Sequence, residues 1–290
     1  MKIVVCVKQI AHTYARTGND PEKHYLAEED NIFRINPCDE LAVGMAIHAR
    51  ELFGEGEISL LTLGPLTAEA ELRRCMALGA DSLCQIDMAD PMDPWQKSVF
   101  LGRAVRELGA DLVFCGTESL DSRNGQVGAL LAHHLDMPFV SCVREMVLLS
   151  IKGSVQVQRS AGRGVREVVE CPLPAVLGVD PGAGSPLLPT YDEKKKCRTI
   201  PIQKFIYDIS TVSARYKRIR IYPPRPRPKT VASPDSRLGA YERISRLLSG
   251  SLVEKKGEML TGDPASQAER MISFMKTHDL LEIKNKEMKG

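Results

Sequence analysis

Several features that often decide a function quickly are missing from this sequence. Its 290 residues include a single tryptophan, and no apolar run approaches the ~20 residues that a membrane-spanning helix needs. The eight cysteines are scattered, without a Cys-x-x-Cys pair or a histidine at metal-ligand spacing. Neither a disulfide framework nor a metal site is therefore expected. Nothing near Met1 resembles a secretory signal, so we expect a cytoplasmic protein without a transmembrane segment.

Motifs for catalysis are equally scarce. The sequence has no Gly-x-Ser-x-Gly elbow, no His-Glu-x-x-His pair, and neither the Gly-x-Gly-x-x-Gly nor the Walker phosphate loop. His133 and His134 fall near the end of an expected helix, where capping or exposure is the ordinary explanation, and Trp95 is expected to pack. No residue is therefore assigned a catalytic role.

What the sequence does contain is a regular alternation of β-branched runs and amphipathic segments. With 43% hydrophobic residues the chain can bury a full core. Strands alternating with helices of 10 to 15 residues indicate βαβ units, so we predict a doubly wound α/β fold: a mostly parallel sheet with helices on both faces. The expected strands are 3–7, 58–63, 83–86 and 112–115, with further strands at 147–157, 166–170 and 175–179; the expected helices are 39–53, 67–78, 93–108 and 125–135. Residues 11–34 form either a hairpin or an ordered loop.

The C-terminal third has a different character. Residues 191–229 hold twelve Lys or Arg against three acids, and the prolines at 223–228 favour an extended linker. No aromatic platform or helix-turn-helix pattern accompanies this charge, so nucleic acid is not an expected partner. Amphipathic helices are predicted at 237–248 and 264–280, the second with Asp263 as N-cap. We therefore expect a nucleotide-binding α/β domain over 1–200, and a basic linker with a helical arm over 201–290 that packs on a partner subunit.

Two segments are candidates for a nucleotide site. Asn-Pro-Cys-Asp-Glu at 36–40 and the glycine-bearing stretch at 115–128 each follow an expected strand and precede an expected helix. Backbone N–H groups and a helix N-terminus are available there for a phosphate. The alternative to a phosphate site is a βα turn that needs glycine only for its backbone conformation. Arg123 either adds a charged contact to the ligand or is exposed to solvent.

In series, these motifs resemble the β subunits of electron transfer flavoproteins, the group that includes the FixA proteins. The resemblance is carried by the opening residues 2–9, by 36–43, Leu-Gly-Pro at 63–65, Arg-Cys-Met-Ala-Leu-Gly-Ala-Asp at 74–81, 110–113, 116–128, Leu-Pro-Ala-Val at 173–176, and Leu-Pro at 188–189 before the lysines at 194–196. It extends from residue 1 to about 200, and more loosely to the end.

The resemblance implies an adenine-nucleotide alpha-hydrolase-like fold and a heterodimer with an α subunit that carries FAD. Such a pair shuttles electrons between acyl-CoA-type dehydrogenases and a downstream acceptor. This chain would itself hold AMP, or a second FAD as in electron-bifurcating members. The redox chemistry would belong to the flavin, so no acid or base is required of the protein.

Carried over by position, the resemblance places the adenine near Cys6, with Asn36, Asp39 and Leu63 around it. The phosphate would lie on the loop 121–128. The cofactor-binding residues implied in this part of the chain are Gly116, Asp121, Ser122, Arg123, Asn124, Gly125, Gln126, Val127 and Gly128. Leu188 would anchor the dehydrogenase partner.

Departures from the family leave the nucleotide open. Ordinary members usually have a basic residue where this chain has Thr117, and an Asn-Gln-Thr where it has 125–127. The short sequence motifs that bifurcating members tend to show are absent from this chain, which has other residues at the corresponding positions 10–13, 93–98 and Ala129. Two other classes remain as alternatives, an ATP pyrophosphatase or ligase of similar fold and a stress-type nucleotide sensor. The first would need a glycine-serine loop after the first strand, which residues 8–12 do not supply.

Overall fold

The chain forms two compact units, Met1–Pro226 and Arg227–Gly290. The computed structural model describes residues 1–12, 32–65, 67, 69–88, 92–150, 153–184, 187–216, 237–248 and 260–277. The division falls later than the boundary expected at residue 200, because strand β11 (Ile202–Phe205) pairs with β5 (Ser82–Ile86) in the sheet of the first unit.

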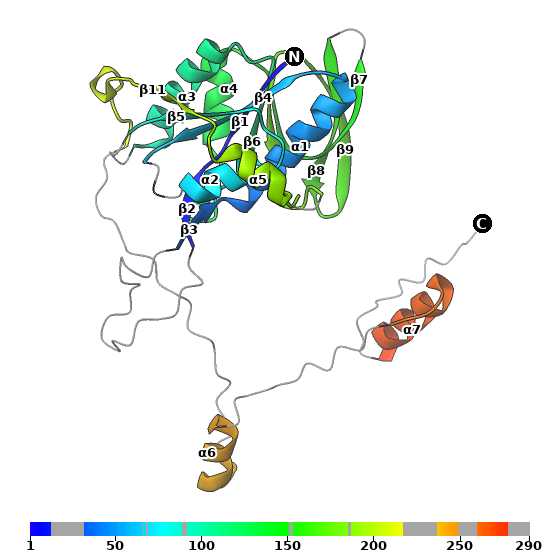
Figure 1. Cartoon of the computed structure of the whole chain (residues 1–290). Helices are drawn as coiled ribbons and strands as arrows, with labels where there is room; N and C mark the ends of the chain where they lie inside the picture. The colour runs from blue at the N-terminus through cyan, green and yellow to red at the C-terminus, as the bar shows by residue number, and fades with distance from the viewer. Residues whose placement is uncertain are drawn as a thin grey trace, which may run out of the picture. The chain divides into compact units, whose positions relative to one another are not determined.

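Nine strands make up the main sheet, in the order β11-β5-β4-β1-β6-β10-β7-β8-β9 (Figure 1). All neighbours from β11 to β7 run parallel, and at one edge β8 pairs antiparallel with both β7 and β9. The predicted mostly parallel α/β sheet is therefore confirmed. The remaining strands are β1 (Lys2–Cys6), β4 (Glu57–Leu63), β6 (Leu112–Gly116), β7 (Phe139–Ser150), β8 (Ser154–Gly162), β9 (Val165–Pro172) and β10 (Ala175–Val179).

Helices cover both faces of this sheet. One core contains Ile3 and Val5 of β1 together with α1 (Pro37–Phe53) and α2 (Glu69–Met76). The other contains Val4 of β1 with α3 (Pro94–Leu108) and α4 (Val127–Leu135). Successive side chains of a strand point to opposite faces, so a strand covered on both sides is apolar throughout. This explains the uninterrupted β-branched run at the start of the chain.

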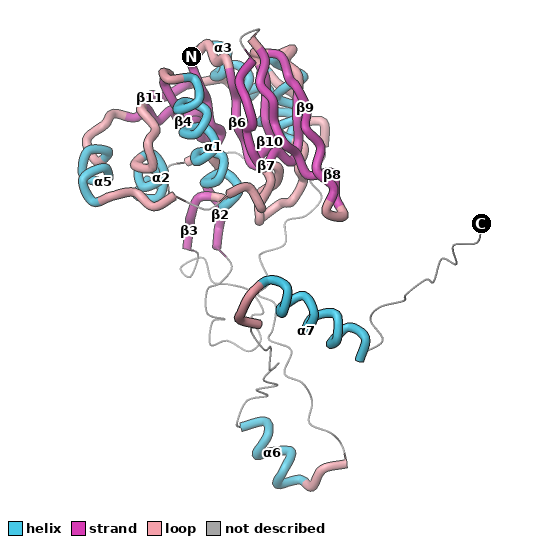
Figure 2. Tube along the Cα trace, turned by 90° about the vertical axis from the view of Figure 1, so that its right-hand side faces the viewer, coloured by secondary structure: helices cyan, strands magenta, loops and turns pink. Residues whose placement is uncertain are grey.

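A second, two-stranded sheet lies beside the main one (Figure 2). It pairs β2 (Gln9–His12) with β3 (Ile32–Ile35) in antiparallel register. Of the two alternatives expected for residues 11–34, the antiparallel pairing of β2 with β3 agrees with the hairpin. Residues 13–31 lie outside the described residues.

The structure corrects the expected strand at 147–157. Residues on both sides of Gly153 are strands, but they belong to β7 and β8, which pair as a hairpin. Gly153 has a φ of 76°, a left-handed conformation that suits glycine in a turn. The sequence pattern runs through this turn because apolar residues flank it on both sides.

The segment after Thr190 also contains regular secondary structure, which an extended linker would lack. It contains α5 (Tyr191–Cys197), then β11, then the short 3-10 helix η2 (Ile209–Thr211). Arg73 of α2 donates to the carbonyls of Cys197 and Ile200 at 2.7 and 2.9 Å, which holds α5 against the main unit. The basic linker expected from residue 201 is therefore wrong for 201–216, and its proline-rich part at 223–228 lies outside the described residues.

The second unit contains two helices, α6 (Ala240–Leu248) and α7 (Pro264–Thr277), as the sequence predicts. Asp263 accepts hydrogen bonds from the N–H groups of Ala265 and Ser266 at 3.1 and 3.0 Å, which confirms it as the cap of α7. Among the described helices of both units, none is long and apolar enough to cross a membrane.

Candidate functional site

A cavity of about 230 Å³ lies at the carboxyl ends of β1 and β6. From β1 the chain runs to β4 and β5 on one side of β1, and then returns through α3 to β6 on its other side, so the strand order reverses between β1 and β6. In open α/β sheets ligands bind in the crevice at such a switch point. The lining residues are Cys6, Val7, Lys8, Gln9, Asn36, Asp39, Leu63, Met92, Pro94, Lys97, Leu101, Cys115 to Ser119, Ser122 and Asn124 to Gly128.

The loop from β6 to α4 forms one wall of this cavity. The backbone N–H and the hydroxyl of Thr117 both donate to the carbonyl of Val179, at 2.9 and 2.8 Å, so this side chain is directed to the end of β10. Gly125 has a φ of 60° just before α4. The N-cap residue Gln126 makes no side-chain cap, and the first N–H groups of a helix have no partner within it. The wall therefore presents backbone donors and the positive end of α4 to the cavity.

Asp39, in the first turn of α1, connects three parts of the site. It is 5% exposed. One carboxylate oxygen accepts from the N–H of Lys8 at 2.8 Å, and the other from the N–H of Gly116 and from Asn36 Nδ2, both at 3.0 Å. Burial raises the pKa of Asp39 to about 7 against the opposing effect of these bonds.

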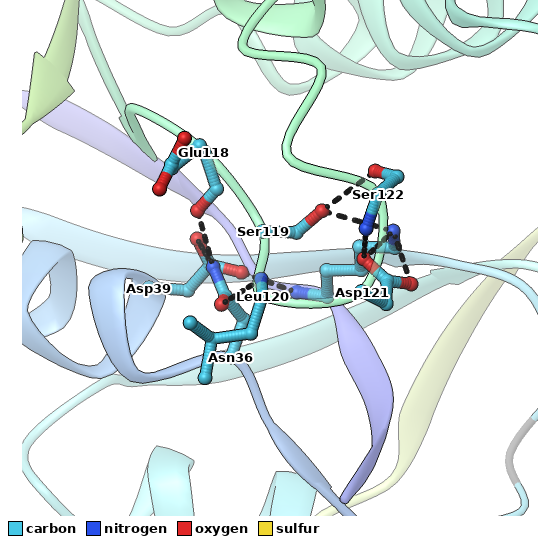
Figure 3. Close-up of polar contacts among 8 residues, drawn as sticks. Asn36, Asp39, Glu118, Ser119, Leu120, Asp121 and Ser122 are labelled. Atoms are coloured by element: carbon cyan, nitrogen blue, oxygen red, sulfur yellow. Dashed lines mark hydrogen bonds and ion pairs between the residues drawn. The ribbon is translucent and has the colours of Figure 1, made fainter. Parts of the chain in front are cut away.

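Asn36 fixes the loop from below (Figure 3). Its Nδ2 also donates to the carbonyl of Glu118 at 3.0 Å, and its Oδ1 accepts from the N–H of Leu120 at 3.2 Å. The proline at position 37 begins α1, where its missing N–H is no loss. The Asn-Pro-x-Asp segment thus starts a helix and shapes the loop that follows another strand.

Lys8 holds the same loop from the end of β1. Its ammonium donates to both carboxylate oxygens of Asp121 at 2.7 Å and to Ser119 Oγ at 3.2 Å. Burial works against ionisation of Asp121, but the bonds from Lys8 and Ser119 outweigh it and hold the pKa of this carboxyl below its usual value. The ion pair therefore persists at neutral pH.

Another part of the lining comes from the start of α3. Met92 and Leu101 contribute apolar surface, and Lys97 contributes an amine on a half-buried side chain. Asp93 caps the helix by accepting from the N–H of Gln96 at 2.7 Å. The cavity thus combines an apolar part with a cationic and donor-rich part.

Residues 206–216 run along α3 from its last turn to its first and hold that first turn; we refer to them as the strap. The N–H groups of Arg215 and Tyr216 donate to Asp93 at 2.5 and 3.1 Å, and Gln96 Nε2 donates to the carbonyl of Val212 at 2.9 Å. The guanidinium of Arg215 lies 3.7 Å from the centre of the Trp95 ring. The ring of Trp95 also packs edge to face against the ring of His134 in α4, with the two ring centres 4.4 Å apart. Trp95 thus packs, as expected.

The thiols in the cavity are poor candidates for chemistry. Burial raises the pKa values of Cys6 and Cys115, the latter to about 12, and the charge of Asp39 raises both further. The reactive form of cysteine is the thiolate, so these groups stay inert at neutral pH. No cluster of three or more His, Cys, Asp or Glu side chains suited to a metal occurs in the described part of the chain.

The structure brings most of the sequence-predicted site residues together. Every residue expected at the nucleotide lines the cavity except Asp121 and Arg123. Asp121 binds Lys8, and Arg123 is exposed, with a φ of 49° and its N–H donating to the carbonyl of Ser119. Leu188 lies outside the cavity, 86% exposed, shortly before α5. It is available to a partner, and its role stays a prediction.

Sequence reasoning missed the contribution of Lys8 and of the α3 wall, Met92, Pro94, Lys97 and Leu101. A signal was present in both cases. Lys8 directly follows the first strand, and the first turns of α3 follow β5 along the chain. Since the carboxyl ends of parallel strands meet at one edge of the sheet, the residues after every strand were candidates.

Comparison with known proteins decides the family. Residues 24–206 match the family described as Electron transfer flavoprotein domain. The chain belongs to the electron transfer flavoprotein family. Within it, the chain is 33% identical to the electron transfer flavoprotein subunit beta of Thermoanaerobacterium thermosaccharolyticum over 179 residues, 61% of this chain and 67% of that protein.

The chain is also similar to a second subunit beta and to a subunit of an Etf-containing complex. The subunit beta of Bacillus subtilis is 28% identical over 246 residues, 84% of this chain and 86% of its own length. The Caffeyl-CoA reductase-Etf complex subunit CarD of Acetobacterium woodii is 32% identical over 180 residues, 61% of this chain and 67% of its own. The resemblance seen in the sequence motifs is therefore confirmed, and electron transfer flavoprotein β subunits pair with an α subunit.

Proposed function

We propose that this chain binds an adenine nucleotide at the β1/β6 cavity and works as one half of an electron carrier whose α subunit holds FAD. The observation that carries the proposal is the position of the cavity, at the sheet's switch point and against the start of α4. A helix N-terminus at such a point favours a phosphate.

The residues present fit an adenine nucleotide. Leu63, Met92 and Leu101 supply apolar surface for a flat base. The loop ending at Gly125 and the first turn of α4 supply backbone donors for a phosphate, and Lys97 supplies a cation from the start of α3. A bound flavin supplies the redox chemistry, and the protein's part is to bind and orient it. This agrees with cavity thiols that stay protonated.

The partner in electron transfer is proposed to be an acyl-CoA-type dehydrogenase. One relative, CarD, is named as a subunit of a caffeyl-CoA reductase-Etf complex, which supports a CoA-thioester enzyme as the class of partner. The exposed Leu188 offers this chain's own contact, since an accessible apolar side chain near the centre of an interface can carry much of its affinity.

The test is to purify the chain together with its α subunit and identify the bound nucleotides after denaturation. One FAD and one AMP per heterodimer would establish the ordinary carrier, and two FAD would establish a second flavin in this cavity. A chain that purifies without a second subunit and binds ATP as a homodimer would contradict the proposal.

A further inference from the structure

The side chain of Asn36 uses both of its N–H donors for hydrogen bonds inside the protein. An asparagine amide has two N–H donors and one oxygen acceptor. Both N–H groups are donated, to Asp39 Oδ1 and to the carbonyl of Glu118, each at 3.0 Å. The oxygen accepts from the N–H of Leu120 at 3.2 Å. Asn36 is 1% exposed, so a base edge would have to displace one of these bonds to receive a donor.

The carboxylate of Asp39 is also held by hydrogen bonds within the protein. Its three bonds connect the N–H of Lys8 at the end of β1, the N–H of Gly116 at the end of β6, and Asn36. Together the two side chains tie residues 116–120 to α1 and to β1. We call this set of bonds the loop clamp.

The clamp reaches the start of α4 through the loop itself. The N–H of Arg123 donates to the carbonyl of Ser119 at 2.9 Å, and the hydroxyls of Ser119 and Ser122 are 2.9 Å apart. The chain then turns at Gly125 into Gln126 and α4. A change at 118–120 would therefore move the backbone donors that face the cavity.

We propose that Asn36 and Asp39 are positioning residues, which hold the 116–126 loop in the shape that binds a nucleotide and do not themselves bind the base. The inference rests on the proposed function and assigns these two residues a role different from the adenine contacts that family resemblance implies. Nucleotide affinity then depends on them through the loop.

The experiment compares two nucleotides that differ only in the base. AMP and GMP are titrated into the full-length chain and into its Asn36→Ala variant by calorimetry. Because the loop binds the shared phosphate, Asn36→Ala should weaken both by about tenfold and leave the AMP to GMP affinity ratio unchanged. Hydrogen exchange of the backbone amides in 116–124 should become faster in the variant.

Glu40 offers a matched control. It lies in the same first turn of α1 and is 8% exposed, but it pairs with Arg74 and, at 3.7 Å, with Arg34, away from the loop. Glu40→Gln should lower the stability of the chain and change AMP affinity less than twofold. An equal loss of affinity in Glu40→Gln would show that general destabilisation, not the clamp, weakens binding, and would overturn the inference.

Two other outcomes would overturn it. A loss confined to AMP would mean that Asn36 contacts the base, and unchanged affinity and exchange in Asn36→Ala would mean that the clamp does not matter. If that variant does not fold, the unmodified chain decides: the amides of Gly116 and Leu120 must exchange slowly before any nucleotide is added, and fast exchange refutes the clamp. Failure of the unmodified chain to bind AMP or FAD would instead count against the proposed function.

Discussion

The carboxylate of Asp39 and the backbone N–H of Gly116 are 3.0 Å apart, although 77 residues separate them along the chain. A Cβ atom at position 116 would collide with that carboxylate and lie 2.7 Å from Cys38 Cβ. Only glycine allows the approach, which is a packing requirement in addition to any role in ligand binding. The 36–40 and 115–128 motifs are therefore two halves of one structural unit.

The buried carboxyl of Asp39 should make the stability of the chain depend on pH. Its pKa is about 7 in the folded chain, against ~3.9 when unfolded. Between these values the folded state binds more protons, so the stabilisation present below pH ~4 should be lost as pH rises to ~7, by roughly 1.4 kcal/mol per pH unit. Urea unfolding at several pH values measures this slope. Asp39→Asn should reduce it by the equivalent of one proton, and an unchanged slope would contradict the assignment.

Lys97 should strengthen the binding of ligands that carry a phosphate and not of ligands that lack one. Lys97 lines the cavity from the first turns of α3, so we expect its ammonium to meet a phosphate bound there. Lys97→Met should weaken AMP about tenfold or more, the value of one charge-assisted bond, and leave adenosine binding unchanged. Lys204→Met, on exposed β11, is the control; equal effects on AMP and adenosine would remove the phosphate contact.

The strap should be visible in tryptophan fluorescence, because Trp95 is the only tryptophan in the sequence. Arg215 lies over its ring at 3.7 Å, a contact worth about 0.5–2 kcal/mol. Arg215→Ala should expose the ring, shift its emission to longer wavelength and lower the unfolding free energy by about that amount. Arg215→Lys keeps the charge and should give a smaller shift. Identical emission spectra for all three chains would contradict the contact.

Periodicity predicted most of the fold because most elements bury a regular stripe or run. The strand Ile202–Phe205 was not predicted, because it lies at the edge of the sheet and only Phe205 of its four residues is buried. An edge strand that is mostly exposed has no apolar run for sequence reasoning to detect. The β7–β8 hairpin was merged into one strand for the opposite reason, since its apolar residues continue across the turn.

The candidate site was predictable where it follows a strand along the chain, and less so where it comes from a neighbouring helix. Asn36 and Gly125 were found from motifs, whereas Lys97 enters the cavity from the α3 wall. Gly128 shows a further limit. A Cβ there would lie 2.7 Å from Cys115 Sγ and 3.2 Å from the Phe139 ring, so packing alone demands glycine and a Gly128→Val variant would not test phosphate binding.

The helical arm should matter for association and not for the fold of the first unit. Tyr241 is 87% exposed and Ile244 56% exposed on α6, one turn apart on a single face. Ending the chain after Pro226 should leave thermal unfolding of the α/β unit unchanged and weaken binding to the α subunit at least tenfold. Tyr241→Ser with Ile244→Ser should reproduce part of the loss. Full binding by the shortened chain, measured by calorimetry, would show that the arm is not the contact.

Leu188 should affect the binding of a partner protein and not the stability of the folded chain. With 86% of its surface exposed, it contributes little to the folded chain, so Leu188→Ala should leave the unfolding midpoint and the bound nucleotide unchanged. If it is the anchor of a dehydrogenase partner, the same change should raise the concentration of dehydrogenase needed for half-maximal electron transfer by about tenfold or more, since burying a leucine is worth ~2 kcal/mol. Ile206 is 87% exposed, and Ile206→Ala is the matched control that removes similar apolar surface elsewhere. Equal effects of the two variants, or none from Leu188→Ala, would remove the anchor assignment.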